Sequence, residues 1–275
     1  MRQPKVVFED EYLLVVNKPT GMVVNRAETV KGETLQDWVD SYAKELNAIA
    51  AVPLSNCRVV RPACRQGRPD ARKRSKDTQT ILNDFSLRNG IVHRLDKETS
   101  GVMVVAKTEE VMNELQRQFK EREVEKVYVA LVHGKLEPKE GWFTLPLSRS
   151  QKDRKKFSVS LGGKKSKTGY KVLEYFGALR FSKTSRGSQR YSLVEAYPKT
   201  GRTHQIRVVF KHLNHPIASD SKYLGKRRLK ADLEWCPRLF LHAKKLRFIH
   251  PKIEERVEFE ADLAEDLRGA LKHLK

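Results

Sequence analysis

Three ionisable side chains, those of His93, Arg94 and Asp96, lie within four residues of one another and shortly before an apolar segment at 102–106. Ionisable groups are rarely placed so close to a buried strand unless they pair or react. An Asp that is held ionised by the neighbouring Arg94 can attack a sugar carbon or act as a general base. The alternative is an Arg94–Asp96 ion pair that only stabilises the turn.

A second group of polar residues, at 200–207, combines a glycine turn with Arg202, His204 and Arg207. It falls at the start of a helix predicted over 203–213, where apolar residues recur at helical spacing. The N-terminus of a helix attracts anions, and arginine binds phosphate in a bidentate geometry. On its residues alone, this segment is typical of a phosphate-contact site.

Metal and disulfide sites are not indicated. His212 and His215 are three residues apart, but no cysteine or carboxylate stands at a matching spacing, so a structural role is the better interpretation. The three cysteines form no CxxC pair, which argues against a zinc knuckle and a disulfide framework. No apolar run is long enough for a membrane span, and the N-terminus lacks the apolar core of a signal peptide. We therefore expect a cytoplasmic protein without a metal.

The formal net charge of +21 is concentrated in two segments. Residues 58–76 carry a net charge of +7 and residues 149–190 a net charge of +11, so the rest of the chain is close to neutral. Such concentrated charge suits a polyphosphate partner, because binding releases the partner's counterions. The alternative is a solvated surface or a partly disordered loop.

The predicted strands occur in runs rather than alternating regularly with helices, which favours an α+β fold with a largely antiparallel sheet. Strands are expected at 6–8, 13–16, 22–24, 102–106, 125–132, 142–145, 170–176, 190–197, 240–249 and 256–260, and helices at 34–47, 108–121, 203–213 and 264–274. Two basic segments, at about 48–90 and 148–168, are expected to be loops inserted in one domain that spans 1–275, the first with a short helix near 80–85.

The segment 93–101, His-Arg-Leu-Asp-Lys-Glu-Thr-Ser-Gly, resembles the signature of the RluA family of RNA pseudouridine synthases. Further blocks resemble other motifs of that family, and they occur in family order over most of the chain. These blocks lie at 13–21, 126–130, 200–207, 215–217, and 239–243 with 248–251. Six ordered blocks leave little room for chance.

The resemblance implies an α/β catalytic domain in which helices flank a bent, mixed and mostly antiparallel sheet with a central cleft. It implies a cofactor-free isomerisation that breaks the bond from ribose to the uracil nitrogen and forms a bond from ribose to uracil C5. By resemblance Asp96 is the catalytic residue, Tyr128 packs on the base and can assist proton removal from C5, and Arg207 pairs with Asp96. The target base must leave its stack to reach such a pocket. Whether the Asp attacks the sugar or removes a sugar proton stays open.

The expected RNA contacts are basic side chains outside this catalytic set. Arg94 matches an arginine that, in some relatives, helps to fill the space left by the flipped nucleotide. The other expected contacts are Arg202, His204, Arg72, Lys73, Arg74, Arg154, Lys155 and Lys156. Many relatives carry a small RNA-binding S4 domain, which we do not expect here, so the basic segments would grip the RNA backbone and read its shape.

A few positions depart from the family pattern, and none of them is Asp96, Tyr128 or Arg207. They are Val209 in place of a common His, Ser219 in place of a common Gly, Asn25-Arg26 in place of a frequent His-Pro, and Leu224 between Tyr223 and Gly225, which are usually adjacent. These differences indicate a divergent subfamily.

We therefore expect a monomeric RNA pseudouridine synthase that needs no cofactor and acts on ribosomal or transfer RNA. One alternative is a catalytically silent RNA-binding protein on the same scaffold, against which the retention of Asp96, Tyr128 and Arg207 argues. The other is a glycoside or nucleoside hydrolase, which would need a second acid near Asp96. The motifs do not suggest such an acid.

Overall fold

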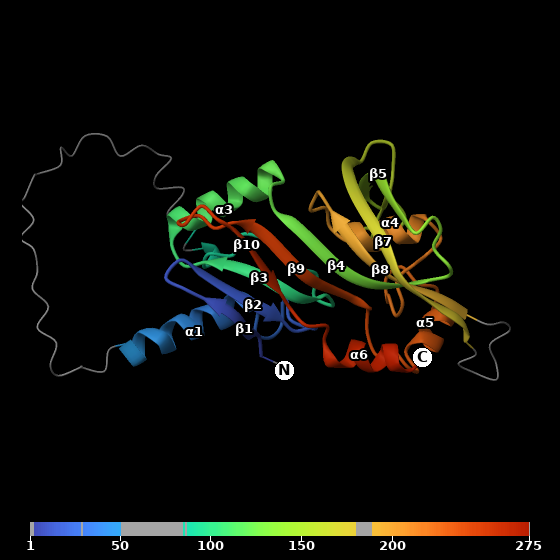
Figure 1. Cartoon of the computed structure of the whole chain (residues 1–275), viewed down its shortest axis with the longest axis horizontal. Helices are drawn as coiled ribbons and strands as arrows, with labels where there is room; N and C mark the ends of the chain where they lie inside the picture. The colour runs from blue at the N-terminus through green and yellow to red at the C-terminus, as the bar shows by residue number, and fades with distance from the viewer. Residues whose placement is uncertain (1–2, 29, 51–84, 86, 180–188, 275) are drawn as a thin grey trace, which may run out of the picture.

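The computed structural model describes residues 3–28, 30–50, 85, 87–179 and 189–274 (Figure 1). The short helix expected near 80–85 and most of the loop expected over 48–90 lie outside these residues.

A ten-stranded mixed sheet forms the centre of the described part of the chain. Its strands are β1 (Lys5–Glu9), β2 (Leu13–Lys18), β3 (Ser100–Ala106), β4 (Glu125–His133), β5 (Glu140–Arg149), β6 (Phe157–Val159), β7 (Lys164–Leu179), β8 (Gln189–Pro198), β9 (Leu241–Ile249) and β10 (Arg256–Glu260). The order across the sheet is β1-β2-β3-β9-β4-β8-β7-β5-β6, and β10 pairs with β9. The parallel pair is β3 with β9, and the other pairs are antiparallel. The expected mixed and mostly antiparallel sheet is confirmed.

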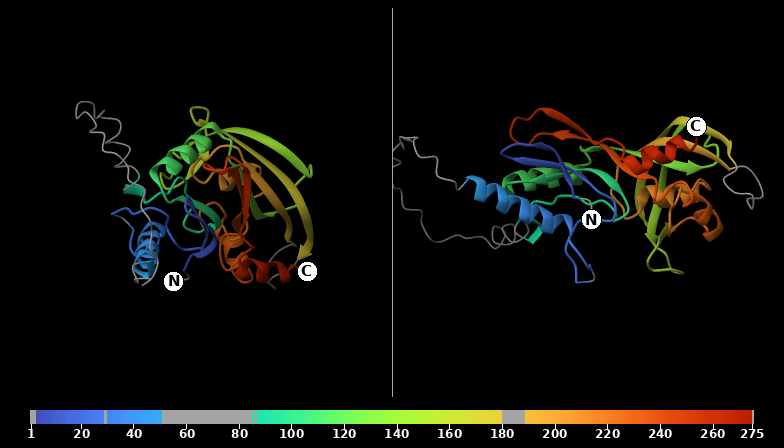
Figure 2. Two further views of the ribbon diagram at one scale, coloured as in Figure 1. Left: turned by 60° about the vertical axis from the view of Figure 1, so that its left-hand side comes forward. Right: turned by 90° about the horizontal axis from the view of Figure 1, so that it is seen from below.

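Helices cover the two ends of this sheet. They are α1 (Leu35–Ala50), α3 (Glu109–Glu121), α4 (Gln205–His212), α5 (Lys226–Asp232) and α6 (Glu265–Lys272). Figures 1 and 2 show the sheet bending, with α1 and α3 beside the β1–β3 end and α4 and α5 beside the β5–β8 end. Thr108 caps the N-terminus of α3, since its side chain accepts a hydrogen bond from the Val111 N–H.

Two large hydrophobic clusters stabilise the described fold. One joins the apolar faces of β2, β3, α1 and α3, and the other joins β4, β8, α4 and α6. The seven residues of β3 are buried, as expected for a central strand that is covered on both faces. Tyr128 of β4 packs against both clusters, so it lies where the two halves of the molecule meet.

Two predictions of local structure are wrong. The segment 22–24 forms no strand; Met22 and Val24 are buried, but the carbonyls of Val23 and Val24 accept hydrogen bonds from the start of α1 instead of from a neighbouring strand. The segment 148–168 is not a loop throughout, because it contains β6 and the beginning of β7. The positive charges of segment 148–168 did not prevent strand pairing. Side chains on a strand alternate between the two faces of the sheet, and lysines on the exposed face cost little free energy.

Candidate active site

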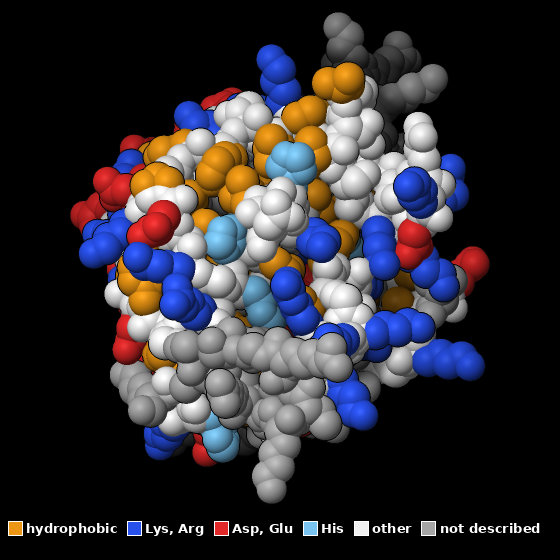
Figure 3. All heavy atoms as spheres, turned by 90° about the vertical axis from the view of Figure 1, so that its right-hand side faces the viewer, with side chains coloured by type: hydrophobic (Ala, Val, Ile, Leu, Met, Phe, Trp, Pro, Cys, Tyr) orange, Lys and Arg blue, Asp and Glu red, His pale blue; other side chains and the backbone are white. Residues whose placement is uncertain are grey.

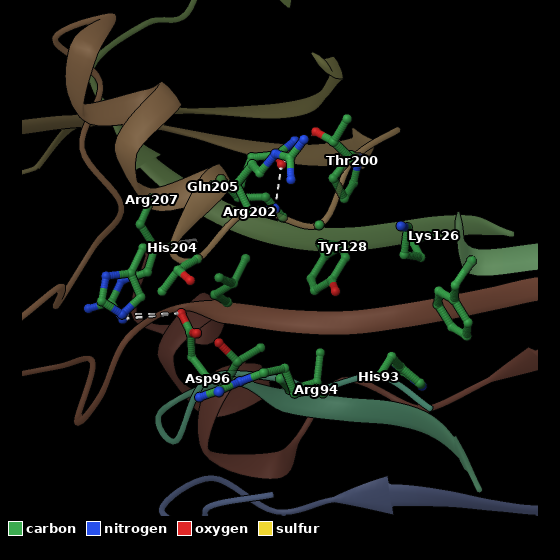
Figure 4. Close-up of a pocket in the computed structure, with 18 of the residues that line it drawn as sticks. His93, Arg94, Asp96, Lys126, Tyr128, Thr200, Arg202, His204, Gln205 and Arg207 are labelled. Atoms are coloured by element: carbon green, nitrogen blue, oxygen red, sulfur yellow. Dashed lines mark hydrogen bonds and ion pairs between the residues drawn. The ribbon is translucent and has the colours of Figure 1, made fainter. Parts of the chain in front are cut away.

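A cavity of about 410 Å³ opens between three segments that are far apart in the sequence. They are the turn before β3, the strand β4, and the segment that leads from β8 into α4. Figure 4 shows Asp96, Tyr128 and Arg207 together in this cavity, with Arg94, Arg202 and His204 around it. The structure thus brings the three expected catalytic residues to one place.

The turn that carries Asp96 is held by the segment 18–22. The Lys18 ammonium donates to the carbonyls of Pro19 and Met22 at 2.9 Å, and the Gly21 N–H donates to the Lys97 carbonyl at 2.8 Å. Gly21 has a φ of 84°, which glycine adopts without strain. Burial and the charge of Arg238 lower the pKa of Lys18 to about 7, whereas Asp96 opposes this shift. The first family-like block therefore fixes the backbone directly after Asp96.

The partners of Asp96 come from α4 and its approach, not from the neighbouring residue in the sequence. Its Oδ2 lies 3.4 Å from Arg207 Nη1 and 3.8 Å from His204 Nε2 (Figure 4). Arg94 is exposed on the cavity wall, and no Arg94–Asp96 ion pair forms within the described residues. The local ion pair weighed as an alternative is therefore wrong, as is the expectation that Arg94 supplies the cation for Asp96.

Arg207 is almost completely buried and is bound by carboxylates of the protein itself. Its guanidinium donates to both oxygens of Asp220, at 2.7 and 2.8 Å, and to Glu98 Oε2 at 3.0 Å. Burial alone would lower the pKa of Arg207, but the hydrogen bonds and charge of Asp220, with Glu98 and Asp96, raise it. A guanidinium held in this way is not available for a phosphate, so Arg207 does not belong to the phosphate-contact site that the residues of segment 200–207 alone suggest.

Asp220 and Glu98 were not found by sequence reasoning. Asp220 follows Ser219, whose φ of 55° belongs to a region that favours glycine, and this is the position where the family pattern has Gly. Ser219 holds that conformation by donating its N–H to Asp232 and its hydroxyl to the Cys236 carbonyl. The Ser219 departure was thus a visible signal for a special turn, and the turn presents Asp220 to Arg207.

Tyr128 and Lys126 extend from β4 towards the same cavity. Burial, with the charge of Asp96, raises the pKa of Tyr128 above its ordinary value, so the phenol is protonated at neutral pH. Burial and Lys199 lower the pKa of Lys126 to about 8. A neutral aromatic ring beside a carboxylate provides a surface on which a base can pack.

The expected RNA contacts occupy different environments. Arg202 is exposed at the cavity, whereas the His204 imidazole is only 8% exposed. Arg154, Lys155 and Lys156 lie in the turn between β5 and β6, and Arg72, Lys73 and Arg74 lie outside the described residues.

A further basic surface was missed by sequence reasoning. The helix α5 exposes Lys226, Arg227, Arg228 and Lys230. Figure 3 faces the end of the molecule that carries α5 and the ends of β7 and β8, and Lys and Arg side chains gather on it. The run was overlooked because its net charge is modest compared with the two longer basic segments.

Within the described residues, no group of three or more His, Cys, Asp or Glu side chains could hold a metal ion. The Nδ1 atom of His215 instead lies 2.7 Å from the His133 carbonyl oxygen, and His212 is exposed on α4.

No described helix is long and apolar enough to cross a bilayer.

Residues 12–212 match the model of the RNA pseudouridylate synthase family. The chain belongs to this family. Its members are isomerases, so the pseudouridine synthase activity expected from the motifs is confirmed at the level of the family.

Relatives of this pseudouridine synthase match it over nearly its whole length. An uncharacterized RNA pseudouridine synthase of Bacillus subtilis, YlyB, is 33% identical over 270 residues, which are 98% of this chain and 72% of that protein. Ribosomal large subunit pseudouridine synthase D of Neisseria meningitidis is 34% identical over 277 residues, covering 98% of this chain but only 61% of that protein. These matches confirm the resemblance to the RluA family.

Solved structures support the fold of the synthase. Human RNA Pseudouridylate Synthase Domain Containing 4 has a TM-score of 0.65 at 24% identity and covers 98% of this chain and 92% of that chain. Human RNA Pseudouridylate Synthase Domain Containing 1 has a TM-score of 0.64 at 23% identity, covering 98% and 87%. The pseudouridine synthase fold class is therefore confirmed.

Proposed function

We propose that this synthase isomerises uridine to pseudouridine in ribosomal RNA, with Asp96 as the catalytic residue. The observation that carries the proposal is the Asp96 carboxylate, which lines a cavity and shares one oxygen with the buried Arg207. Two of the relatives have names that give a substrate. They are ribosomal large subunit pseudouridine synthase D and ribosomal large subunit pseudouridine synthase C. Transfer RNA is the other substrate class that the sequence leaves open.

The roles of the three central residues follow from their charges and places. Arg207 Nη1 donates to Asp96 Oδ2 and so orients the carboxylate, which is the group that can attack the sugar or remove a sugar proton. Tyr128, as a neutral phenol, packs against the flipped base, and its protonated state limits it as a base for the C5 proton. The cavity volume falls within the range of roughly 300–1,000 Å³ that is usual for small-molecule sites.

Glu98 bears on the alternative of a glycoside or nucleoside hydrolase, because it is a second acid that shares Arg207 with Asp96. A glycosidase needs an acid and a base or nucleophile that face the same bond. Glu98 is bound by Arg207 through Oε2 and by the Ser221 hydroxyl through Oε1, and it does not line the cavity. Its carboxylate orients Arg207, which leaves Asp96 as the acidic side chain of the cavity wall.

The RNA is bound, in this proposal, by basic side chains around the cavity. Arg94 and Arg202 lie at the cavity itself, and Arg154, Lys155 and Lys156 lie on the β5–β6 turn. The proposal includes Arg72, Lys73 and Arg74, and it adds the exposed cations of α5. We further propose a single catalytic domain over 1–275 that acts as a cytoplasmic monomer without a cofactor.

The test is the substitution Asp96→Asn, assayed in buffer that contains a chelator. Pseudouridine formation on ribosomal RNA should fall below detection, because the amide is neither a nucleophile nor a base, while RNA affinity stays within about twofold. Asp262→Asn, at an exposed position before α6, is the matched control. An active Asp96→Asn protein would refute the catalytic assignment, and a metal requirement of the wild type would refute the cofactor-free proposal. Pseudouridine mapping across total RNA, in a deletion strain and its parent, identifies the substrate.

A further inference from the structure

We infer that His204 is a positioning residue for Asp96: a neutral imidazole, whose tautomer is fixed by Tyr223, holds Oδ2 together with Arg207 and leaves Oδ1 as the oxygen that meets the substrate. The inference rests on the proposed catalytic role of Asp96. It assigns His204 a place inside the catalytic machinery rather than on the RNA-binding surface.

The backbone at His204 is the first observation. This residue directly precedes α4 and has a φ of 55°, in the left-handed region that is unfavourable for most side chains. A residue at this position commonly caps the helix, but the His204 side chain makes no capping hydrogen bond. Strained backbone conformations concentrate at functional sites. Here the conformation accompanies an imidazole that faces Asp96 instead of the helix end.

The tautomer follows from the hydrogen bonds of Tyr223. Its hydroxyl oxygen accepts from the Phe157 N–H at 2.9 Å and lies 2.8 Å from His204 Nδ1. A backbone N–H can only donate, so the proton of the tyrosine hydroxyl is free to donate to Nδ1. A neutral imidazole that accepts at Nδ1 carries its proton on Nε2. That Nε2–H is the group 3.8 Å from Asp96 Oδ2.

Burial favours the neutral form of the imidazole, while the charges around it act in both directions. The groups that face it are Asp96, Arg207, Lys222, Asp220 and Tyr223. Burial lowers the pKa of His204 to about 4, with Arg207 and Lys222 acting in the same direction and Asp96 and Asp220 against it. The ring also makes an edge contact with Phe157, at a centroid distance of 5.9 Å, which limits its rotation.

Lys222 provides the competing arrangement. Its Nζ lies 3.5 Å from Nε2 and could donate to an unprotonated Nε2. In that case, however, Nδ1 would carry the proton, the Tyr223 hydroxyl would lose its acceptor among the described residues, and a lone pair would face the Asp96 carboxylate. An ammonium on a flexible stem can turn to solvent, whereas Tyr223 is held by Phe157.

The consequence concerns the two oxygens of Asp96. Arg207 and His204 both approach Oδ2, and Oδ1 makes no hydrogen bond or ion pair with any described residue. The Arg207 hydrogen bond is long, and His204 Nε2 at 3.8 Å is beyond hydrogen-bond distance from Oδ2; catalytic hydrogen bonds commonly tighten only when substrate binds. With Oδ2 held from two sides, rotation of the carboxylate is restricted and Oδ1 is the oxygen available to the sugar.

The first experiment reads the tautomer without RNA. Nitrogen-15 NMR of the histidine rings in the whole protein at neutral pH should give His204 as a neutral ring protonated on Nε2. Tyr223→Phe, which removes the donor to Nδ1, should shift this signal towards a mixture of tautomers. A wild-type ring that is protonated on Nδ1, or on both nitrogens, would overturn the inference.

The second experiment compares two substitutions by single-turnover kinetics. His204→Asn suits a positive φ and keeps an acceptor near Nδ1 but loses the donor to Asp96, so the rate of isomerisation should fall on the order of 10²-fold at unchanged RNA affinity. His204→Gln places an amide N–H near Nε2 and should recover about tenfold of that loss. A fully active His204→Asn protein, or a His204→Gln protein no better than His204→Asn, would refute the positioning role.

The two proposals fail in different ways. If the wild type forms no pseudouridine, or if Asp96→Asn is active, the proposed function fails, whatever the tautomer of His204. If wild type is active, Asp96→Asn is inactive and His204→Asn is unchanged in rate, only the positioning role fails.

Discussion

At the scale of single residues, the site depends on one guanidinium that is shared among three carboxylates. Arg207 binds Asp220 through Nε and Nη2, reaches Glu98 through Nη2 as well, and reaches Asp96 through Nη1. The planar fork of arginine suits this sharing, whereas the point charge of lysine would not. Because Asp220 compensates most of the charge, Asp96 stays only loosely bound, at 3.4 Å, and keeps an oxygen for chemistry.

His93 carries a prediction about pH and stability. Its Nε2 accepts a hydrogen bond from the Val104 N–H of β3 at 3.1 Å, which only the neutral ring can do. Burial, with the charge of Lys126, lowers the pKa of His93 to about 3. The unfolded chain takes up this proton near pH 6.5. The neutral ring of His93 therefore contributes fully to the free energy of unfolding above about pH 6.5. This contribution is lost as the pH falls towards about 3, by at most about 1.4 kcal/mol per pH unit.

Urea denaturation at several pH values tests this prediction. The free energy of unfolding should decrease below about pH 6.5, and the decrease should be shallower in His93→Gln, whose amide oxygen can accept the same hydrogen bond without titrating. Equal slopes in the two proteins would show that His93 does not contribute.

The motifs located Asp96, Tyr128 and Arg207 because each stands in an ordered block. They did not locate Glu98 and Asp220, whose roles depend on contacts across the fold. Arg207 and Glu98 are 109 residues apart, and spacing along the chain carries no information about such a contact. For the same reason the residues alone point to Arg94, the nearest cation in the sequence, as the partner of Asp96, whereas the family resemblance points to Arg207, which the fold supplies from 111 residues away.

At the scale of elements, the basic segment after β5 is a hairpin. The strand β6 pairs with β5 through Phe157, Ser158 and Val159, and the chain returns through Gly162-Gly163 into β7. The sequence does show alternation there, but the dense lysines were interpreted as loop composition. Phe157 connects this hairpin to the site, because its N–H donates to Tyr223.

A pair of glycine substitutions tests the importance of this hairpin. A Cβ at Gly163 would lie 2.6 Å from the Leu147 backbone, whereas a Cβ at Gly162 would meet nothing within 4 Å. Gly163→Ala should therefore lower the free energy of unfolding by about 1–3 kcal/mol and reduce pseudouridine formation. Gly162→Ala is the control and should leave both nearly unchanged. Equal behaviour of the two variants in denaturation and activity assays would contradict the close approach.

At the scale of the whole molecule, much of the exposed positive charge lies away from the catalytic carboxylate. Arg207 beside Asp96 is paired with carboxylates, and Arg94 and Arg202 are exposed at the cavity, while further exposed cations lie on the β5–β6 turn and on α5. An enzyme that must extract one base from a folded RNA benefits from this separation, because the backbone can be held while the base moves.

Reversing the charge of Arg154, Lys155 and Lys156 to glutamate should weaken RNA binding and flatten its salt dependence. Each lost phosphate contact should reduce the slope of log affinity against log salt by about 0.7–0.9. The control reverses three exposed lysines at the β1 and α1 end, Lys5, Lys31 and Lys44. Binding titrations at several salt concentrations measure both slopes. An unchanged affinity and slope in the first variant would show that the β5–β6 turn does not contact RNA.

The sharing of the site between two hydrophobic clusters has a consequence for folding. Asp96 precedes β3, which belongs to one cluster, and Arg207 lies on α4, which belongs to the other. The strand β3 pairs with its parallel neighbour β9, and about half of the chain lies between these two strands. Contacts between such distant segments form late, because the loop between them must close first. On the ribosome, the turn with Asp96 emerges more than a hundred residues before its arginine. Catalytic competence should therefore be among the last properties that a newly made chain acquires.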